Sequence, residues 1–217
     1  MGPAGSSPLI RRWSESFDAL GGLHGPEWLQ QLRHQAAEKF ARSGLPDRKT
    51  EAWKYTPMRL LESIDPAIAV PARHESTAAH FPEPLVEADE PLIDILDGCP
   101  APDLPRLPGG VTLLPLAQGL ERFEDRIRDL LGDVELDGAG RTFAALNTAF
   151  LENGLVLHVA EGVGAARLGI RWAFSPGTNS LLHNCRLVVL LDRGAELRIV
   201  EQFQSREPTR NLSLIHI

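Results

Sequence analysis

The chain has 217 residues, of which 43% are hydrophobic and 24% are charged, a balance typical of a folded globular protein. Its formal net charge is −7, and residues 83–137 hold fourteen acidic side chains against four arginines, which disfavours a nucleic-acid partner. No apolar run approaches the roughly 20 residues that span a membrane, and the N-terminus lacks the pattern of a secretory signal.

Two amphipathic helices are predicted within the first 43 residues. Over Pro8–Leu20, apolar side chains recur at spacings of three and four residues. A second helix is predicted from Pro26 to about Ser43, with Pro26 in its first turn and Gly44 just past its end. The two helices should pack together as a hairpin-like unit.

The segment that follows reads GLPDRKTEAWKYT, over residues 44–56. Pro46 should force an extended exit from the helix, and either Asp47 or Thr50 can cap a new turn. We expect Trp53 to bury its ring against the helix pair, and Tyr55 to keep its hydroxyl near a polar partner. The motif is therefore interpreted as a docking joint, and any role of Trp53, Lys54 and Tyr55 beyond packing is left open.

The middle of the chain gives mixed signals. Residues from about Glu62 to Asp89 show no sustained period and are interpreted as a connection. Two apolar runs, Leu92–Leu96 and Val111–Leu116, are predicted strands of a small mixed subdomain, separated by a long turn-rich loop. Apolar spacing then predicts a helix over about 120–131, ended by Gly132, and another over Thr142–Leu151.

From Gly154 onwards the sequence favours β-structure. Four short runs, LVLHVA, LGIRWAF, RLVVLL and ELRIVEQF, are divided by EGVGAAR, SPGTNS and DRGA, in which Gly194 suits a tight turn. This pattern is compatible with a sandwich, a barrel or a solenoid of stacked strands. We predict three regions: a helical one over 1–61, a mixed α/β one over 62–151, and a β region over 152–217.

Residues that could carry chemistry are sparse. The sequence has no P-loop, no GxGxxG and no GxSxG motif, and Ser175 fits a turn better than a nucleophile. Cys99 and Cys185 suit a reduced, cytoplasmic protein and are interpreted as small buried hydrophobes. His158 and His183 each stand alone on a predicted strand, so a structural role is favoured over metal binding.

The stretch GLPDRKTEAWKYTPMRLL resembles the N-terminal signature of the SufD family, related to SufB in the Suf system of iron–sulfur cluster assembly. The matching residues are Leu45, Pro46, Arg48, Lys49, Glu51, Trp53, Lys54, Tyr55, Thr56, Leu60 and Leu61. Two further blocks, AALNTAFLENGLVLHVAEGV and HNCRLVVLLDRGAELRIVEQF, are similar to the family's entry into its β region and to its early strands.

The resemblance implies an α+β chain: an N-terminal helical region and a small mixed subdomain, followed by the first rungs of a right-handed parallel β-helix. It also implies a SufD-like, non-catalytic subunit of a SufBCD-type scaffold. A SufB-like paralogue would pair through its β-helix, and a SufC-like ATPase would bind a C-terminal domain that this chain lacks. The intact complex would handle the iron–sulfur cluster, and this chain would bind no cofactor by itself.

The chain departs from the resemblance in stopping early, so it is expected to be an N-terminal fragment that aggregates or stays partly unfolded beyond about residue 150. The final SLIHI also breaks the family pattern. No catalytic or metal-binding residue is carried over from the family. Two alternatives stay open: a cupin-like metal-binding enzyme with its metal near His158 or His183, and an interaction module unrelated to clusters.

Overall fold

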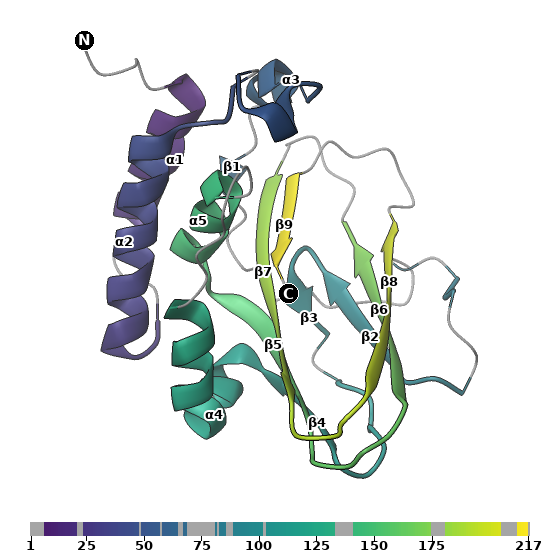
Figure 1. The fold of residues 1–217 in the computed structure, drawn as a ribbon. Coiled ribbons are helices and arrows are strands. Elements are labelled where there is room, and N and C mark those ends of the chain that lie inside the picture. Colours follow the sequence, from purple (N-terminus) through teal and green to yellow (C-terminus); the bar gives the residue numbers. More distant parts are fainter. Residues whose placement is uncertain are drawn as a thin grey trace.

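The computed structural model describes residues 7–20, 24–47, 49–56, 58–64, 67–68, 81, 83–85, 89–101, 103–132, 141–174, 181–204 and 212–216. Helices lie on one side of the molecule and cover the outer face of one β-sheet, and a second sheet packs against the inner face of the first (Figure 1). The chain is therefore a mixed α+β protein, as predicted. No helix among the described residues has the length and apolarity that crossing a membrane requires.

The two predicted N-terminal helices are present as α1 (Pro8–Ala19) and α2 (Glu27–Ser43). Trp13 of α1 is fully buried, with its ring centroid 5.9 Å from that of Phe40 in α2. Gly44 ends α2 with a φ of 67°, a conformation that costs glycine little. Pro26 lies just before the first helical residue rather than in the first turn, and its carbonyl accepts hydrogen bonds from the amides of Leu29 and Gln30.

Short elements follow the helix pair. They are the 3-10 helix η1 (Glu51–Trp53), the helix α3 (Met58–Ile64) and the two-residue strand β1 (Ala67–Ile68). The connection predicted from Glu62 thus begins with the end of a helix and a strand that pairs with a later strand. Most of the rest of that connection lies outside the described residues, as do residues 175–180, where the SPGTNS turn was predicted.

Eight further strands form two sheets. They are β2 (Leu92–Leu96), β3 (Cys99–Pro100), β4 (Val111–Pro115), β5 (Asn153–Val159), β6 (Ala166–Ala173), β7 (Leu181–Leu191), β8 (Leu197–Gln204) and β9 (Leu212–His216). The first sheet has the order β1-β7-β5-β4, with β9 also paired to β7, and the second has the order β3-β2-β6-β8. All four predicted β runs after Gly154 are confirmed as strands, and the terminal SLIHI forms most of β9.

The chain alternates between the two sheets from β5 to β9. Strands β5, β7 and β9 pair in parallel in one sheet, and β6 and β8 pair in parallel in the other. The DRGA turn, with Gly194 at a φ of 72°, therefore carries the chain from one sheet to the other and is not a hairpin. Alternation is also visible within β5: Leu155 and Leu157 face the core between the sheets, whereas Val156 faces the helices.

The strands of the middle region do not form a sheet of their own. β2 pairs in parallel with β6, and β4 pairs antiparallel with β5, so both join the sheets of the C-terminal strands. Asp97 and Gly98, at φ values of 51° and 80°, form a two-residue hairpin turn into β3. The expectation of strands belonging to a small separate subdomain is thus corrected, while the boundaries at 61 and 151 stay predictions.

The remaining helices are α4 (Leu116–Gly132) and α5 (Arg141–Ala149). α4 begins four residues before the predicted start at Leu120 and has a kink at Phe123, where φ is −128° and ψ is 29°. Gly119 lets α4 approach β5 closely, because a Cβ at this position would overlap the Val156 side chain. The helical layer is thereby fixed against the first sheet.

Candidate functional site

The motif at residues 44–56 is a compact turn at the end of α2. Asp47 Oδ1 accepts hydrogen bonds from the amides of Lys49, at 2.9 Å, and Thr50, at 3.2 Å. Thr50 occupies the N-cap position of η1 without a capping bond from its side chain. Of the two predicted capping residues, Asp47 supplies the side-chain contact, and Arg48 lies outside the described residues.

The aromatic residues of the motif have opposite environments. Trp53 is half-buried and packs against Phe143 of α5, with 5.1 Å between the ring centroids. The predicted burial of Trp53 is thus found in part, but against α5 rather than against the helix pair. Tyr55 is 87% exposed, and Lys54 Nζ lies 5.4 Å from the centre of its ring. Exposure of this extent places the Tyr55 ring at the surface and not in a polar niche.

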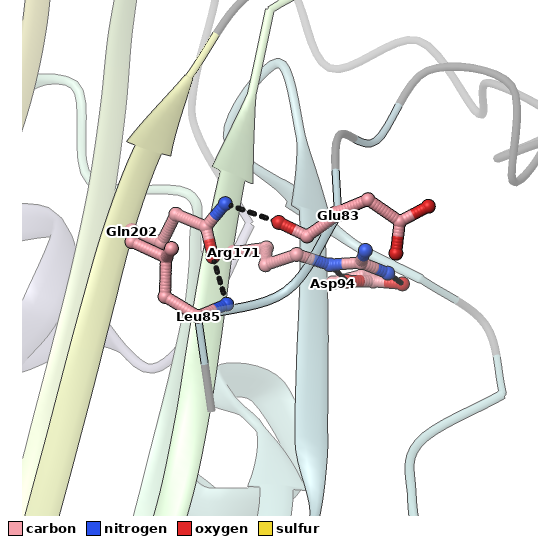
Figure 2. A network of polar contacts seen from close by, with 5 residues as sticks. All are labelled: Glu83, Leu85, Asp94, Arg171 and Gln202. Atoms are coloured by element: carbon pink, nitrogen blue, oxygen red, sulfur yellow. Dashed lines mark hydrogen bonds and ion pairs between the residues drawn. The ribbon is translucent and has the colours of Figure 1, made fainter. Parts of the chain in front are cut away.

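A polar row crosses the outer face of the second sheet. Asp94 on β2, Arg171 on β6 and Gln202 on β8 are register partners on adjacent strands. Arg171 donates two hydrogen bonds to Asp94, from Nε at 2.7 Å and from Nη2 at 2.8 Å (Figure 2). Such a paired geometry is among the stronger polar interactions in proteins and ties β2 to β6.

The same row holds a segment that precedes β2. Gln202 Nε2 donates to the carbonyl oxygen of Glu83, and the amide of Leu85 donates to Gln202 Oε1, both at 2.8 Å (Figure 2). The Arg171 guanidinium also lies 5.0 Å from the ring centre of Phe81, which is only 3% exposed. One glutamine and one arginine therefore attach residues 81–85 to the outer face of the sheet.

The inner face of β8 is incompletely covered. Trp172 Nε1 donates to Glu201 Oε1 at 2.9 Å, and the Trp172 ring stacks on Phe203 with centroids 5.7 Å apart. Phe203 is nevertheless 52% exposed. β6 pairs with one side of β8, and no described strand lies along the other side. Among the described residues, β8 thus combines an edge without a partner strand with an exposed aromatic ring.

The two candidate histidines lie far apart. His158 pairs with Leu190, which is seven residues from His183 on the same strand, or about 23 Å at 3.3 Å per residue. His158 Nε2 lies 2.8 Å from Asp192 Oδ2, and the buried His183 has its Nε2 4.0 Å from Asp97 Oδ1. In the described parts of the chain, no three His, Cys, Asp or Glu side chains converge on a possible metal position. The two histidines therefore do not meet at one position, and a cupin-like metal site near His158 or His183 stays a prediction.

The two cysteines are brought near each other by the fold. Asn153 pairs in register with Cys185, and its Nδ2 lies 3.5 Å from Cys99 Sγ. Burial raises the pKa of Cys185 to about 12, and burial together with the charge of Asp97 raises the pKa of Cys99. Both thiols are therefore protonated near neutral pH, which suits a packing role better than nucleophilic or metal chemistry.

A buried polar link, which was not predicted from the sequence, joins α5 to β7. Arg186, 2% exposed, donates to Asn147 Oδ1 from Nε at 3.0 Å and from Nη2 at 2.7 Å. Asn147 Nδ2 in turn donates to the carbonyl of Cys185 at 3.2 Å. Burial lowers the pKa of Arg186 to about 10, so the side chain stays charged and must keep these partners.

The motif and the helices around it resemble a known family. Residues 14–74, which include the second half of α1 and all of α2, η1 and α3, match the family described as SufBD protein N-terminal region. Over this region, the chain is similar to the SufBD family. The iron-sulfur cluster assembly protein SufD of Escherichia coli (strain K12) is 40% identical over 53 residues. That stretch spans 24% of this chain and 11% of the length of the Escherichia coli protein.

The region that matches the SufBD family includes only some of the features described above. The stretch that identified the family from the sequence lies inside the matched region, so that resemblance is confirmed. The polar row at β8 and the Arg186 link lie outside it. Sequence reasoning missed both features, although alternation along ELRIVEQF, in which Leu197 and Ile199 pack into the core, places Gln202 on the outward face.

Proposed function

We propose that this SufBD-family chain acts as a SufD-like subunit of a SufBCD-type scaffold for iron–sulfur cluster assembly. The observation that carries the proposal is the match of residues 14–74 to the SufBD N-terminal region, supported by a relative named for cluster assembly. In this role the chain contributes surfaces rather than reacting groups, and it is not an enzyme. The buried thiol of Cys185 and the half-buried thiol of Cys99, which stay protonated near neutral pH, agree with that role.

We further infer that the two sheets are the first turns of a parallel β-helix. Parallel pairing within each sheet, and alternation of the chain between sheets from β5 to β9, are the features expected of a solenoid of stacked rungs. The free side of β8 and the exposed ring of Phe203 are then where a following strand would stack. Such a strand would come from further rungs.

The proposed partners follow from the family role. A SufB-like paralogue would associate through the β-helix, and a SufC-like ATPase would bind a helical domain beyond the present residues. The cluster is the cargo of the whole complex, and we assign no residue of this chain to it. A cytoplasmic location fits the two free cysteines, which the fold brings close together without a disulfide.

Co-purification tests this proposal. The tagged product of the gene that encodes this chain would be expressed together with SufB-like and SufC-like proteins and purified under anaerobic, reducing conditions. We expect all three proteins to elute together in a fixed stoichiometry, whereas a tag-only control retains neither partner. Recovery of the tagged protein alone, with both partners in the unbound fraction, would remove the proposed role.

A further inference from the structure

A cavity of about 350 Å³ lies between the N-terminal parts of α2 and α4. Its apolar wall includes Pro26 at the start of α2, and Leu116, Ala117 and Leu120 in the first turns of α4. Leu116 and Leu120 are themselves 3% and 8% exposed, so this wall belongs to the packed core and has a fixed shape. The volume suits a small organic molecule.

The cavity has a buried cationic wall. Arg33 is 2% exposed and donates to the carbonyl of Leu151 from Nε and to that of His24 from Nη1, both at 2.7 Å. Burial lowers its pKa to about 10, an effect that the charge of Glu152 opposes, so the guanidinium is charged at neutral pH. These bonds hold the planar group in place at the cavity, with Nη2 as its remaining nitrogen.

Three carboxylates also border the cavity. Glu124 is held by Trp28 Nε1 and by Arg128 Nη2, each at 2.7 Å from its Oε1. Glu152 is half-buried and interacts with the charge of Arg33, and Glu121 is exposed. Across the described residues, no three such ligands could share a metal ion, so these carboxylates surround a volume instead of meeting at a point. The arrangement suits an organic ligand better than an inorganic cation.

We propose that this cavity binds a small zwitterion with an apolar body, such as an α-amino acid with an aliphatic side chain. The ligand's carboxylate pairs with Arg33, its ammonium group pairs with Glu152, and its apolar part packs on Leu116 and Leu120. A purely anionic ligand would face the surrounding carboxylates, and a purely cationic one would face the buried guanidinium. A zwitterion satisfies both charges of the wall.

Trp28 provides a reporter, because its indole N–H is bonded to Glu124 in the cavity wall. The ¹⁵N-labelled chain would be titrated with leucine, with isopentylamine, which lacks the carboxylate, and with 4-methylpentanoate, which lacks the ammonium group. We expect a saturable shift of the Trp28 indole signal with leucine, and at least tenfold weaker binding of each analogue. Isothermal titration calorimetry would give the dissociation constants independently.

Variants locate the binding site. Ala117→Phe should fill the cavity and abolish binding, and Glu152→Gln should weaken leucine binding at least tenfold. Glu15→Gln makes the same charge change at an exposed position of α1 and should leave binding unchanged. Circular dichroism would establish that each variant is folded.

Three outcomes would overturn the proposal: no saturable shift with leucine, equal affinity for leucine and either analogue, or undiminished binding by folded Ala117→Phe protein. The measurement needs no partner protein, so it stands or fails separately from the cluster-assembly role.

Discussion

The two ends of the paired sheets differ in how their edges are finished. At one end, β3 and β4 are short and antiparallel to their neighbours, and each ends in a proline, Pro100 or Pro115. Leu104 and Leu107, from the loop between these strands, pack onto the core between the sheets. At the other end, β8 is eight residues long and parallel to β6, and it exposes Phe203.

This difference indicates which end closes the structure and which can be extended. Proline cannot donate a backbone hydrogen bond, and short antiparallel strands covered by a loop discourage further pairing. A long parallel strand with one unpaired side and an exposed aromatic ring has neither protection. We call the end with β3 and β4 the closed end and the end with β8 the open end. Each prediction below alters one of these ends, or a strand between them, and compares the result with a control.

The largest effect is expected at Gly154 in β5, the strand that pairs with β4 on one side and with β7 on the other. A Cβ at this position would overlap the backbone carbonyl oxygen of Arg186 on β7, so Gly154→Ala must push β5 and β7 apart. We expect the free energy of unfolding to fall by about 3 kcal/mol or more, measured by chemical denaturation. Gly164→Ala is the control, because a Cβ there meets no atom within 4 Å. Equal stability of the two variants would contradict the close pairing of β5 and β7.

A smaller effect is expected at the closed end. Gly98 has a φ of 80° in the hairpin turn that leads into β3, and an alanine there must adopt the left-handed conformation. Gly98→Ala should lower the free energy of unfolding by about 1–2 kcal/mol. Gly109→Ala, in the next loop, between β3 and β4, without a positive φ or a neighbouring atom within 4 Å, should change it by less than about 0.5 kcal/mol. If both variants behave alike, the turn does not secure this end.

At the open end, charge should act on association more than on stability. Phe203→Asp places a carboxylate beside the unpaired side of β8 and should reduce concentration-dependent self-association, measured by sedimentation velocity. The loss of the stack on Trp172 should lower the free energy of unfolding by about 1 kcal/mol. Leu130→Asp, at a 47% exposed position on α4, is the matched control and should leave association unchanged. A similar decrease in both variants would show that the edge of β8 has no special part in association.

The sequence predicted the elements better than their partners. The helices α1, α2 and α5 and the strands β5 to β8 were found because apolar spacing and glycine turns are local signals. Pairing is not local: nothing in LIDIL indicates that it lies beside GIRWA, 77 residues later, and so β2 was assigned to a mixed subdomain. The Asp-Gly pair at 97–98 did carry a hairpin signal, which the interpretation as a long loop overlooked.

The candidate sites show the same limit. The motif at 44–56 carried the family resemblance, because a long string of residues is specific even when its structural role is modest. Three features depend on side chains that meet from distant segments. They are the hydrogen bonds of Gln202 to the segment before β2, the bonds of Arg186 to Asn147, and the cavity beside Arg33. Their residue types are ordinary surface types, so only the fold distinguishes them from solvated side chains.

The smallest effect on stability is expected from Asp192, in the turn between β7 and β8. Hydrogen bonds from His158 and Arg126 lower the pKa of Asp192 below its ordinary value, so the folded state prefers its charged form. The stability from this preference is present above the unfolded pKa and is lost as the pH falls through the lower, folded pKa. Between pH 6 and pH 3, the unfolding midpoint of the wild type should therefore fall more than that of Asp192→Asn, which cannot lose a charge. Asp125→Asn, at a 96% exposed side chain on α4, should keep the wild-type dependence. Parallel curves for the wild type and Asp192→Asn would show that the β7–β8 turn gains no stability from this charge.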